Sequence, residues 1–186
     1  RCSLVTKYFF ILFVIFFITE TDASEKKKII KNLKNIQNLN FNFEQSIKGK
    51  IEKGNCTIEY PKKIFCKYKG SKNKILVSNG SSLIIKTNES YYRYPLKKTP
   101  LNLILDKDFL IKKITTLEKR LINKTFIDYA ITENDYKINI FFDKKTYNLK
   151  GWQMLDVYKN LNITFISSTK KNQNIADNLF NLPTQD

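Results

Sequence analysis

Short segments in which apolar and polar residues alternate make up most of this 186-residue chain from Phe41 onward. A period of two is that of a β-strand, whose successive side chains point to opposite faces of a sheet. Turn residues separate the segments, most clearly Tyr60-Pro61-Lys62-Lys63 and the hairpin signal Asn79-Gly80. The strands predicted in this way are residues 41–45, 49–60, 64–69, 74–78, 81–86, 91–94, 126–131, 137–143, 147–156 and 161–167.

Helical spacing replaces the alternation in two places. Residues 25–39 predict an amphipathic helix, with apolar side chains three and four residues apart at Ile29, Ile30, Leu33 and Ile36. Residues 95–122 predict one or two short helices, with apolar positions at Leu101 to Leu105, Phe109, Leu110, Ile114 and Leu117. Residues 176–180 predict a short helical turn that closes one end of the fold.

This order of elements defines an α+β fold class. A long twisted antiparallel meander has to close, split or be covered, so we expect residues 24–186 to form one domain, an unclosed antiparallel β-barrel with a helical lid. The helices of residues 95–117 carry more apolar surface than a surface loop needs, which favours a hydrophobic cavity between lid and barrel. A solid core would show the same alternation, because periodicity does not distinguish a packed interior from a hollow one.

Residues 1–23 are typical of a secretory signal peptide. Lys7 precedes an uninterrupted apolar run from Tyr8 to Ile18, and Thr21 and Ala23 supply the small residues of a cleavage site. The run is shorter than the roughly 20 residues of a membrane-spanning helix, so export is favoured over the alternative, a retained N-terminal anchor. The sequence therefore predicts a periplasmic location.

Cys56 and Cys66 fall on the same face of two strands joined by the turn at Pro61. Cross-strand neighbours have the separation that a disulfide needs, and an oxidising compartment would allow the bond to form. Two buried free thiols are the alternative, because cysteine is also a common core residue.

The formal charge is +16, from 33 Lys and Arg against 17 Asp and Glu. Such a charge suits nucleic acid, an anionic membrane or an acidic partner. However, the lysines are scattered along the whole chain, and Asn and Ile are abundant as well, as a biased base composition would produce. We therefore expect no nucleic-acid interface.

The residues of common catalytic and metal sites are missing from the sequence. It contains no His, which excludes the Ser-His-Asp and Cys-His arrangements. It has no glycine-rich phosphate-binding motif, and Cys56 and Cys66 have no further partners for zinc. We expect a protein that is not an enzyme and that needs no metal and no cofactor.

Six short motifs are similar, in the same order, to those of the LolA outer-membrane lipoprotein carriers. That family has an F-x-F-x-Q strand, a Gly-initiated strand ending in a Pro turn, V-S-D-G, T-P-L, I-x-G-W-x-x-x-D and N-x-x-I-x-D-x-L-F-x-x-P. The matching segments here are Phe41–Gln45, Gly54–Pro61, Val77–Gly80, Thr99–Leu101, Leu149–Asp156 and Asn172–Pro183.

The resemblance implies a monomeric periplasmic chaperone that holds lipoprotein acyl chains in its cavity. It also implies three partners: acylated lipoproteins, an inner-membrane ABC transporter of the LolCDE type, and an outer-membrane receptor of the LolB type. The expected lipid-binding residues are Phe41, Phe43, Ile58, Tyr60 and Ile64 in the wall, and Leu101, Leu103, Ile104 and Leu110 in the lid.

Alternatives within the same fold are a LolB-like receptor and an envelope lipid-binding or stress-sensing module. A LolB-like receptor needs a lipobox Cys at the cleavage site, where this chain has Ala23-Ser24. One position departs from the LolA pattern, since many members have Arg before the turn Pro to hold the lid closed. This chain has Tyr60 there, which leaves one phenol hydrogen bond to the lid in place of a guanidinium.

Overall fold

The computed structural model describes residues 23–70, 72–156 and 158–185. The predicted signal peptide, residues 1–23, lies outside the described residues except for its last position. Among the described residues, no helix combines the length and the apolar character that a bilayer crossing requires.

Eleven antiparallel strands form one sheet in the order β6-β5-β4-β3-β2-β1-β11-β10-β9-β8-β7. Within the described chain, β6 and β7 are its two edges, so the sheet is not closed and the predicted unclosed barrel is confirmed. The N-terminal half supplies β1 (Asn38–Ile47), β2 (Lys50–Glu59), β3 (Lys63–Tyr68), β4 (Ile75–Asn79), β5 (Ser82–Lys86) and β6 (Tyr91–Pro95). The C-terminal half supplies β7 (Arg120–Ile122), β8 (Phe126–Glu133), β9 (Tyr136–Asp143), β10 (Leu149–Leu155) and β11 (Leu161–Lys171).

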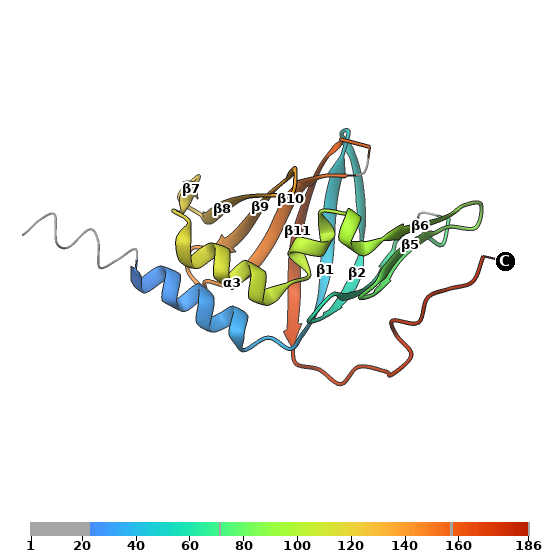
Figure 1. Cartoon of the computed structure of the whole chain (residues 1–186), viewed down its shortest axis with the longest axis horizontal. Helices are drawn as coiled ribbons and strands as arrows, with labels where there is room; N and C mark the ends of the chain where they lie inside the picture. The colour runs from blue at the N-terminus through green and yellow to red at the C-terminus, as the bar shows by residue number, and fades with distance from the viewer. Residues whose placement is uncertain (1–22, 71, 157, 186) are drawn as a thin grey trace, which may run out of the picture.

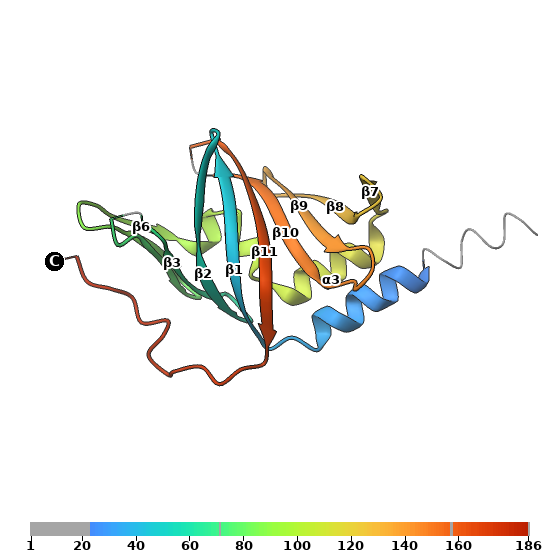
Figure 2. The ribbon, with the colours of Figure 1, turned by 180° about the vertical axis from the view of Figure 1, so that it is seen from behind.

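The helices all lie against one face of this bent sheet, as the two opposite views show (Figure 1 and Figure 2). The N-terminal helix covers residues 23–34 of the described chain. The lid consists of η1 (Leu96–Lys98), α2 (Leu101–Ile104) and α3 (Lys107–Thr116). Pro100 precedes α2, and the Asp106 carboxylate caps α3 by accepting a hydrogen bond from the Phe109 amide at 3.0 Å.

The core lies between the sheet and the helices. Ile29, Leu33 and Ile36 point into it from the N-terminal segment, and Ile104, Leu110 and Ile114 do so from the lid. The strands contribute every second residue, for example Phe41, Phe43 and Gln45 of β1. The alternation in the sequence thus corresponds to an inner face under the helices and an outer face away from them.

Three elements differ from the prediction. The first helix ends at residue 34 and not at Leu39, because Leu39 belongs to β1 and pairs with Ile58 on one side and Lys171 on the other. Residues 120–122 were predicted to belong to the helical segment 95–122, but they form the strand β7, because α3 ends at Thr116 and three residues are too few to show an alternation. Residues 177–180 form a turn, but the tail that contains it lies on the outer face instead of closing one end.

The C-terminal tail covers the outer face of β3 to β6 (Figure 2). The Tyr91 hydroxyl donates to the Pro183 carbonyl, Lys86 donates to the Thr184 carbonyl, and Lys63 lies over the Phe180 ring. Val77 and Ile84 point outward on β4 and β5, yet at most 1% of each is exposed. The tail therefore gives this half of the sheet a second apolar layer.

Candidate functional site

A cavity of about 770 Å³ opens at the end of the half-barrel where the β1–β2 and β10–β11 turns lie. We call it the mouth cavity. Its volume is within the range of small-molecule sites. The inner faces of β1 to β6, the start of α2 and the end of β10 surround it, and its apolar lining is Ile47, Ile51, Tyr68, Leu76, Leu83, Ile85, Tyr92, Tyr94, Pro100, Leu101, Met154 and Tyr158.

A smaller cavity of about 60 Å³ lies next to the mouth cavity. Six residues line both spaces, namely Gln45, Tyr68, Leu76, Leu101, Met154 and Asn162. The rest of its wall includes Phe43, Ile64 and Trp152 of the barrel interior. The apolar lining is therefore continuous from the mouth toward the core, and Leu101 of the lid lies at the junction.

Four polar side chains in the wall of the mouth cavity bind one another. The Lys74 ammonium lies 2.8 and 3.0 Å from the two oxygens of the Glu52 carboxylate, and the Gln45 amide donates to Glu52 at 2.8 Å. Gln45 also donates to the Tyr68 hydroxyl at 3.4 Å, and Lys74 lies 4.1 Å from the centre of the Tyr68 ring. The Glu52 and Lys74 side chains are only 11% and 19% exposed, so the pair is largely shielded from water.

This arrangement shifts the pKa values of Glu52 and Tyr68. Burial by itself would raise the pKa of Glu52, but the hydrogen bonds from Lys74 and Gln45 outweigh it and lower the pKa below its usual value. Burial, together with the nearby Glu52 carboxylate, raises the pKa of Tyr68. At neutral pH the wall therefore holds a carboxylate, an ammonium that balances it and an intact phenol.

Two tyrosines meet across the opening of the mouth cavity. Tyr94 of β6 and Tyr158 of the β10–β11 turn place their hydroxyls 3.4 Å apart. The hydrogen bond with Tyr158, with burial and charge effects, raises the pKa of Tyr94 to about 12. This contact joins the outer strand of the open edge to the opposite hairpin, so it narrows the entrance.

Lys62 fastens the lid to the barrel. Its ammonium donates to the Asn102 carbonyl oxygen at 2.8 Å and to the Asn102 side chain at 2.9 Å, and forms an ion pair with Asp106 at 2.9 Å. Its backbone amide donates to the Leu105 carbonyl at 2.9 Å. A cis bond between Tyr60 and Pro61 and a φ of 72° at Lys62 turn the chain toward α2 at this point.

Two further lysines hold α3 at its ends. Lys107 donates to the Ile36 carbonyl at 2.7 Å, which links the lid to the end of the N-terminal segment. Lys113 forms an ion pair with Glu133 of β8 at 2.6 Å. Because α3 is fixed at both ends, α2 is the part of the lid next to the mouth cavity whose attachment depends most on Lys62.

The predicted lid hydrogen bond of Tyr60 is wrong. Its hydroxyl is buried and has no hydrogen-bond partner among the described residues, and burial raises its pKa. The residue is partly buried and packs against the core, with Lys107 over the ring. The contact that the LolA resemblance assigns to an Arg before the Pro is made here by Lys62, the residue after the Pro.

The structure places the nine predicted lipid-binding residues on the inner side of the fold, in two groups. Phe43 and Ile64 line the small cavity, and Leu101 lines both cavities. Of the other six, Phe41, Ile58, Leu103, Ile104 and Leu110 are buried in the core, and Tyr60 is partly buried and packs against it. Sequence reasoning missed the polar residues of the wall, although Gln45 and Glu52 share the parity of inward residues on β1 and β2.

Cys56 and Cys66 form a disulfide, the first of the two alternatives that the sequence left open. They are paired directly across β2 and β3, with Cα atoms 4.1 Å apart. Both also line the small cavity. The bond therefore ties together two strands of the wall beside the mouth cavity.

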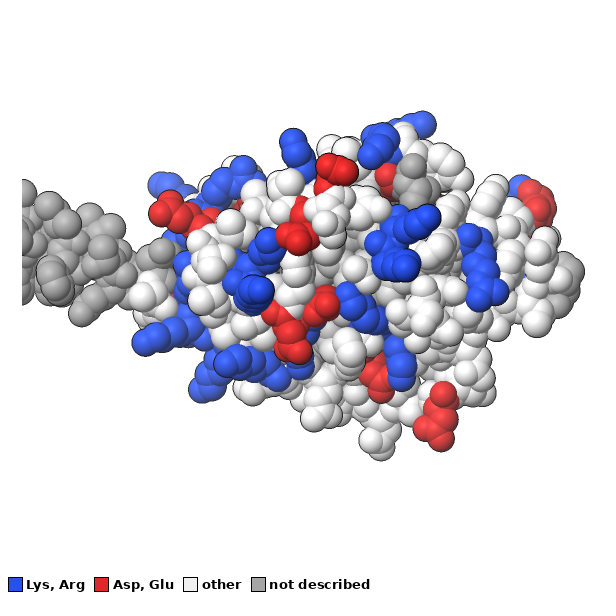
Figure 3. Space-filling model, viewed as in Figure 1, with Lys and Arg blue, Asp and Glu red and all other residues white. Residues whose placement is uncertain are grey.

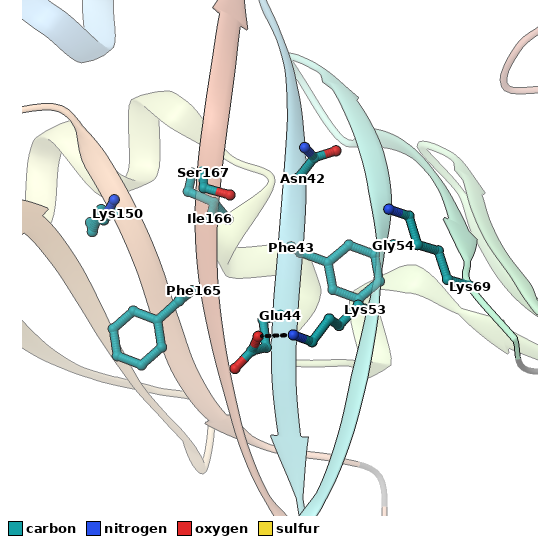
Figure 4. A pocket seen from close by; sticks show the side chains of 10 residues that line it. All are labelled: Asn42, Phe43, Glu44, Lys53, Gly54, Lys69, Lys150, Phe165, Ile166 and Ser167. Carbon is teal, nitrogen blue, oxygen red and sulfur yellow. Dashed lines mark ion pairs between the residues drawn. The ribbon is translucent and has the colours of Figure 1, made fainter.

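A second hollow, of about 450 Å³, lies on the outer face of β2, β1 and β11 (Figure 4). An ion pair between Glu44 and Lys53, 2.7 Å long, crosses it, and Lys69 and Lys150 lie at its sides. The exposed Phe165 ring stacks on Phe141 beside it, with ring centres 5.8 Å apart. Its charged lining is poorly suited to acyl chains, so the mouth cavity is the better candidate site.

Positive charge does not gather in a single patch on the face shown in Figure 3, where lysines and arginines are interspersed with acidic residues. The described residues also contain no group of His, Cys, Asp or Glu side chains that could hold a metal ion.

Comparison with known proteins identifies the family. The model of the family described as outer membrane lipoprotein carrier protein LolA matches residues 34–183, which is most of the chain. The search of curated proteins found no match.

Solved structures with a similar fold share little sequence with this chain. An uncharacterized conserved protein from Thermus thermophilus has a TM-score of 0.50 and 8% identity, covering 88% of this chain and 95% of its own. A LolA superfamily protein from Nitrosomonas europaea has a TM-score of 0.44 and 8% identity, with 87% and 97% covered. The lipoprotein LppX from Mycobacterium tuberculosis has a TM-score of 0.43 and 10% identity, with 82% and 97% covered. On the match of the family model, the chain belongs to the LolA family, whose fold indicates a protein that binds lipids or lipoproteins.

Proposed function

We propose that this protein is a periplasmic carrier that holds the acyl chains of lipoproteins in the mouth cavity and moves them from the inner to the outer membrane. The observation that supports this most is the mouth cavity itself, an opening of about 770 Å³ whose apolar lining runs on toward the core. A predicted signal peptide and a family of binding and chaperone proteins, rather than enzymes, agree with it.

The physical task of such a carrier is to shield hydrocarbon from water without retaining it. Each CH₂ group removed from water contributes roughly 0.8 kcal/mol, so bare acyl chains would enter any membrane or apolar surface that they met. The mouth cavity can take chains at its open end. Displacement of Leu101 with α2 would extend the space toward Phe43, Ile64 and Trp152.

The attachment of the lid to the barrel is compatible with opening of the lid to admit acyl chains. Lys62 fixes α2 through polar contacts made by a side chain that is 24% exposed, so water can replace these contacts when the lid moves. The apolar lid residues Leu103, Ile104 and Leu110 would then line the enlarged space. We propose that an inner-membrane ABC transporter of the LolCDE type delivers the cargo to a monomer of this protein and that a LolB-like receptor accepts it.

Two adjacent residues of β4 allow a matched test. Leu76 lies in the cavity wall, whereas Ile75 points to the outer face and pairs with Lys67 and Lys86. Leu76→Asn should weaken binding of a diacylated lipopeptide about ten- to hundred-fold, because a buried aliphatic side chain contributes roughly 1.5–3 kcal/mol. Ile75→Asn is the control and should leave the affinity within about two-fold.

Binding can be measured by displacement of a fluorescent fatty-acid probe, and circular dichroism can verify that both variants fold. Equal affinities of the wild type and a folded Leu76→Asn variant would refute the assignment of the mouth cavity as the acyl-chain site.

A further inference from the structure

The wall of the mouth cavity contains more polar chemistry than a container for hydrocarbon needs. Gln45, Glu52, Tyr68 and Lys74 are joined by the hydrogen bonds described above, and Asn162 of β11 lies in the same wall. We call these five residues the polar band. It crosses β11, β1, β2 and β3 at the open end, and the side chains of the adjoining small cavity are mainly apolar.

Most acceptors of the polar band already accept a hydrogen bond. One Glu52 oxygen accepts from Lys74, and the other accepts from Lys74 and Gln45. The Thr164 hydroxyl donates to the Asn162 side-chain oxygen at 3.1 Å. Within the described chain, the Gln45 side-chain oxygen is the acceptor of the band that receives no hydrogen bond, so a donor group of a ligand finds little that is free.

Two neutral donors of the polar band remain unused. The Asn162 side-chain NH₂ donates to no group among the described residues, although Asn162 is only 6% exposed and lines both cavities. The Tyr68 hydroxyl accepts from Gln45, but its own hydrogen has no acceptor in the described part of the chain. Both residues line the cavity, where a bound acceptor would give each donor a hydrogen bond in a shielded wall.

The net charge of the polar band determines whether it favours a neutral or an anionic acceptor on a ligand. The Glu52 carboxylate balances the Lys74 ammonium, so the band as a whole is neutral and would give a free carboxylate or phosphate no buried counter-charge. The lysines at the rim, Lys50 and Lys69, are exposed, and water screens their attraction. A neutral carbonyl oxygen fits the two free donors better than an anion does.

From these observations we infer that the polar band binds the carbonyl oxygens of ester-linked acyl chains, and so recognises a diacylglyceryl head group rather than hydrocarbon alone. This inference depends on the proposed function, because it places the head at the mouth with its chains against the apolar lining. The band then selects esterified acyl chains over free fatty acids of the same length.

The test compares three ligands of equal chain length. They are a short-chain S-diacylglyceryl-cysteine peptide, its dialkyl ether analogue without the carbonyl groups, and a free fatty acid. Their affinities are measured by probe displacement for the wild type, Tyr68→Phe, Asn162→Leu and the double variant. Asn42→Leu, the same substitution at an exposed position on the outer face of β1, is the control.

The ester-to-ether affinity ratio is compared between variants, so the different hydration of the two ligands cancels. One net hydrogen bond corresponds to about a two- to twelve-fold change in affinity. Each single variant should therefore reduce the ratio by about that factor, and the double variant should reduce it by about four- to 140-fold. The control should keep the wild-type ratio.

Three results would overturn the inference while leaving acyl-chain binding intact. They are a wild-type protein that binds ester and ether equally, a double variant that keeps the wild-type ratio, and a fatty acid bound more tightly than the ester. If none of the three ligands binds, the proposed function fails together with the inference. Tyr68→Phe keeps the ring and its contact with Lys74, so it tests the hydroxyl alone even if Asn162→Leu does not fold.

Discussion

Replacing Lys62 by Met should release α2 from the barrel while leaving the sheet intact. The substitution keeps most of the apolar stem but removes the hydrogen bonds to Asn102 and the ion pair with Asp106. Hydrogen bonds to charged groups contribute about 1.5–3 kcal/mol each. Both side chains of the ion pair are partly exposed, at 24% and 31%, so water replaces part of what is lost.

We therefore expect the closed lid to lose about 2 kcal/mol, which corresponds to roughly a thirty-fold increase in the open population. The backbone hydrogen bond from the Lys62 amide to Leu105 remains, so α2 should loosen without unfolding. Asp106→Asn should have a smaller effect, because it removes the ion pair but keeps a good N-cap for α3.

Amide hydrogen exchange measures this opening directly. The amides of residues 101–105 should exchange about thirty-fold faster in Lys62→Met, and those of β10 and β11 should not change. Lys63→Met is the matched control, because Lys63 pairs with Glu59 on the barrel. Exchange of residues 101–105 within three-fold of the wild type would refute the role of Lys62.

Three further predictions concern β2 and its contacts. Replacing Cys56 and Cys66 together by Ala should lower the free energy of unfolding in urea by about 2–3 kcal/mol, from the loop-closure entropy of a short loop, and an unchanged midpoint would contradict this. Because the pKa of Glu52 is below 4.5 in the folded state, its pair with Lys74 stabilises the protein above that pH and is lost as the pH falls through the folded pKa. The stability difference between wild type and Glu52→Gln should then shrink as the pH falls below 4.5, and a difference independent of pH would exclude the pair as its source. Gly54→Ala should destabilise the fold by about 1–3 kcal/mol in the same urea assay, because its Cβ would collide with a backbone carbonyl oxygen of β3, and a neutral effect would show that the strands can separate there.

The order of strands and helices could be predicted from the sequence because each element is long enough to show its period. Phe41, Phe43 and Gln45 reveal an inner face by alternation, and Ile29 and Leu33 reveal a helix by spacing. The end of the first helix could not be placed, because Leu39 continues the apolar pattern but pairs within the sheet.

The candidate site was less predictable, because its position depends on which apolar side chains pack against one another and which border an empty space. Leu101 borders a cavity and Ile104 does not, although both are apolar lid residues. Glu52 could have been found as a charged residue at an inward position of β2. Its partner Lys74 stands at the start of the predicted strand 74–78 and has the same parity as Leu76 of the cavity wall, but parity alone does not show that the two charges pair. Lys62 was missed because a cis peptide bond and a left-handed backbone direct it toward the lid.

Native mass spectrometry of the protein isolated from a bacterial envelope tests the central claim, that the mouth cavity holds acyl chains, most directly. We predict a population of the wild type that carries a diacylated lipoprotein or lipopeptide, and a marked loss of that population in Leu76→Asn but not in Ile75→Asn. A wild-type protein that carries no acylated species, or an adduct equally abundant in both variants, would contradict the claim.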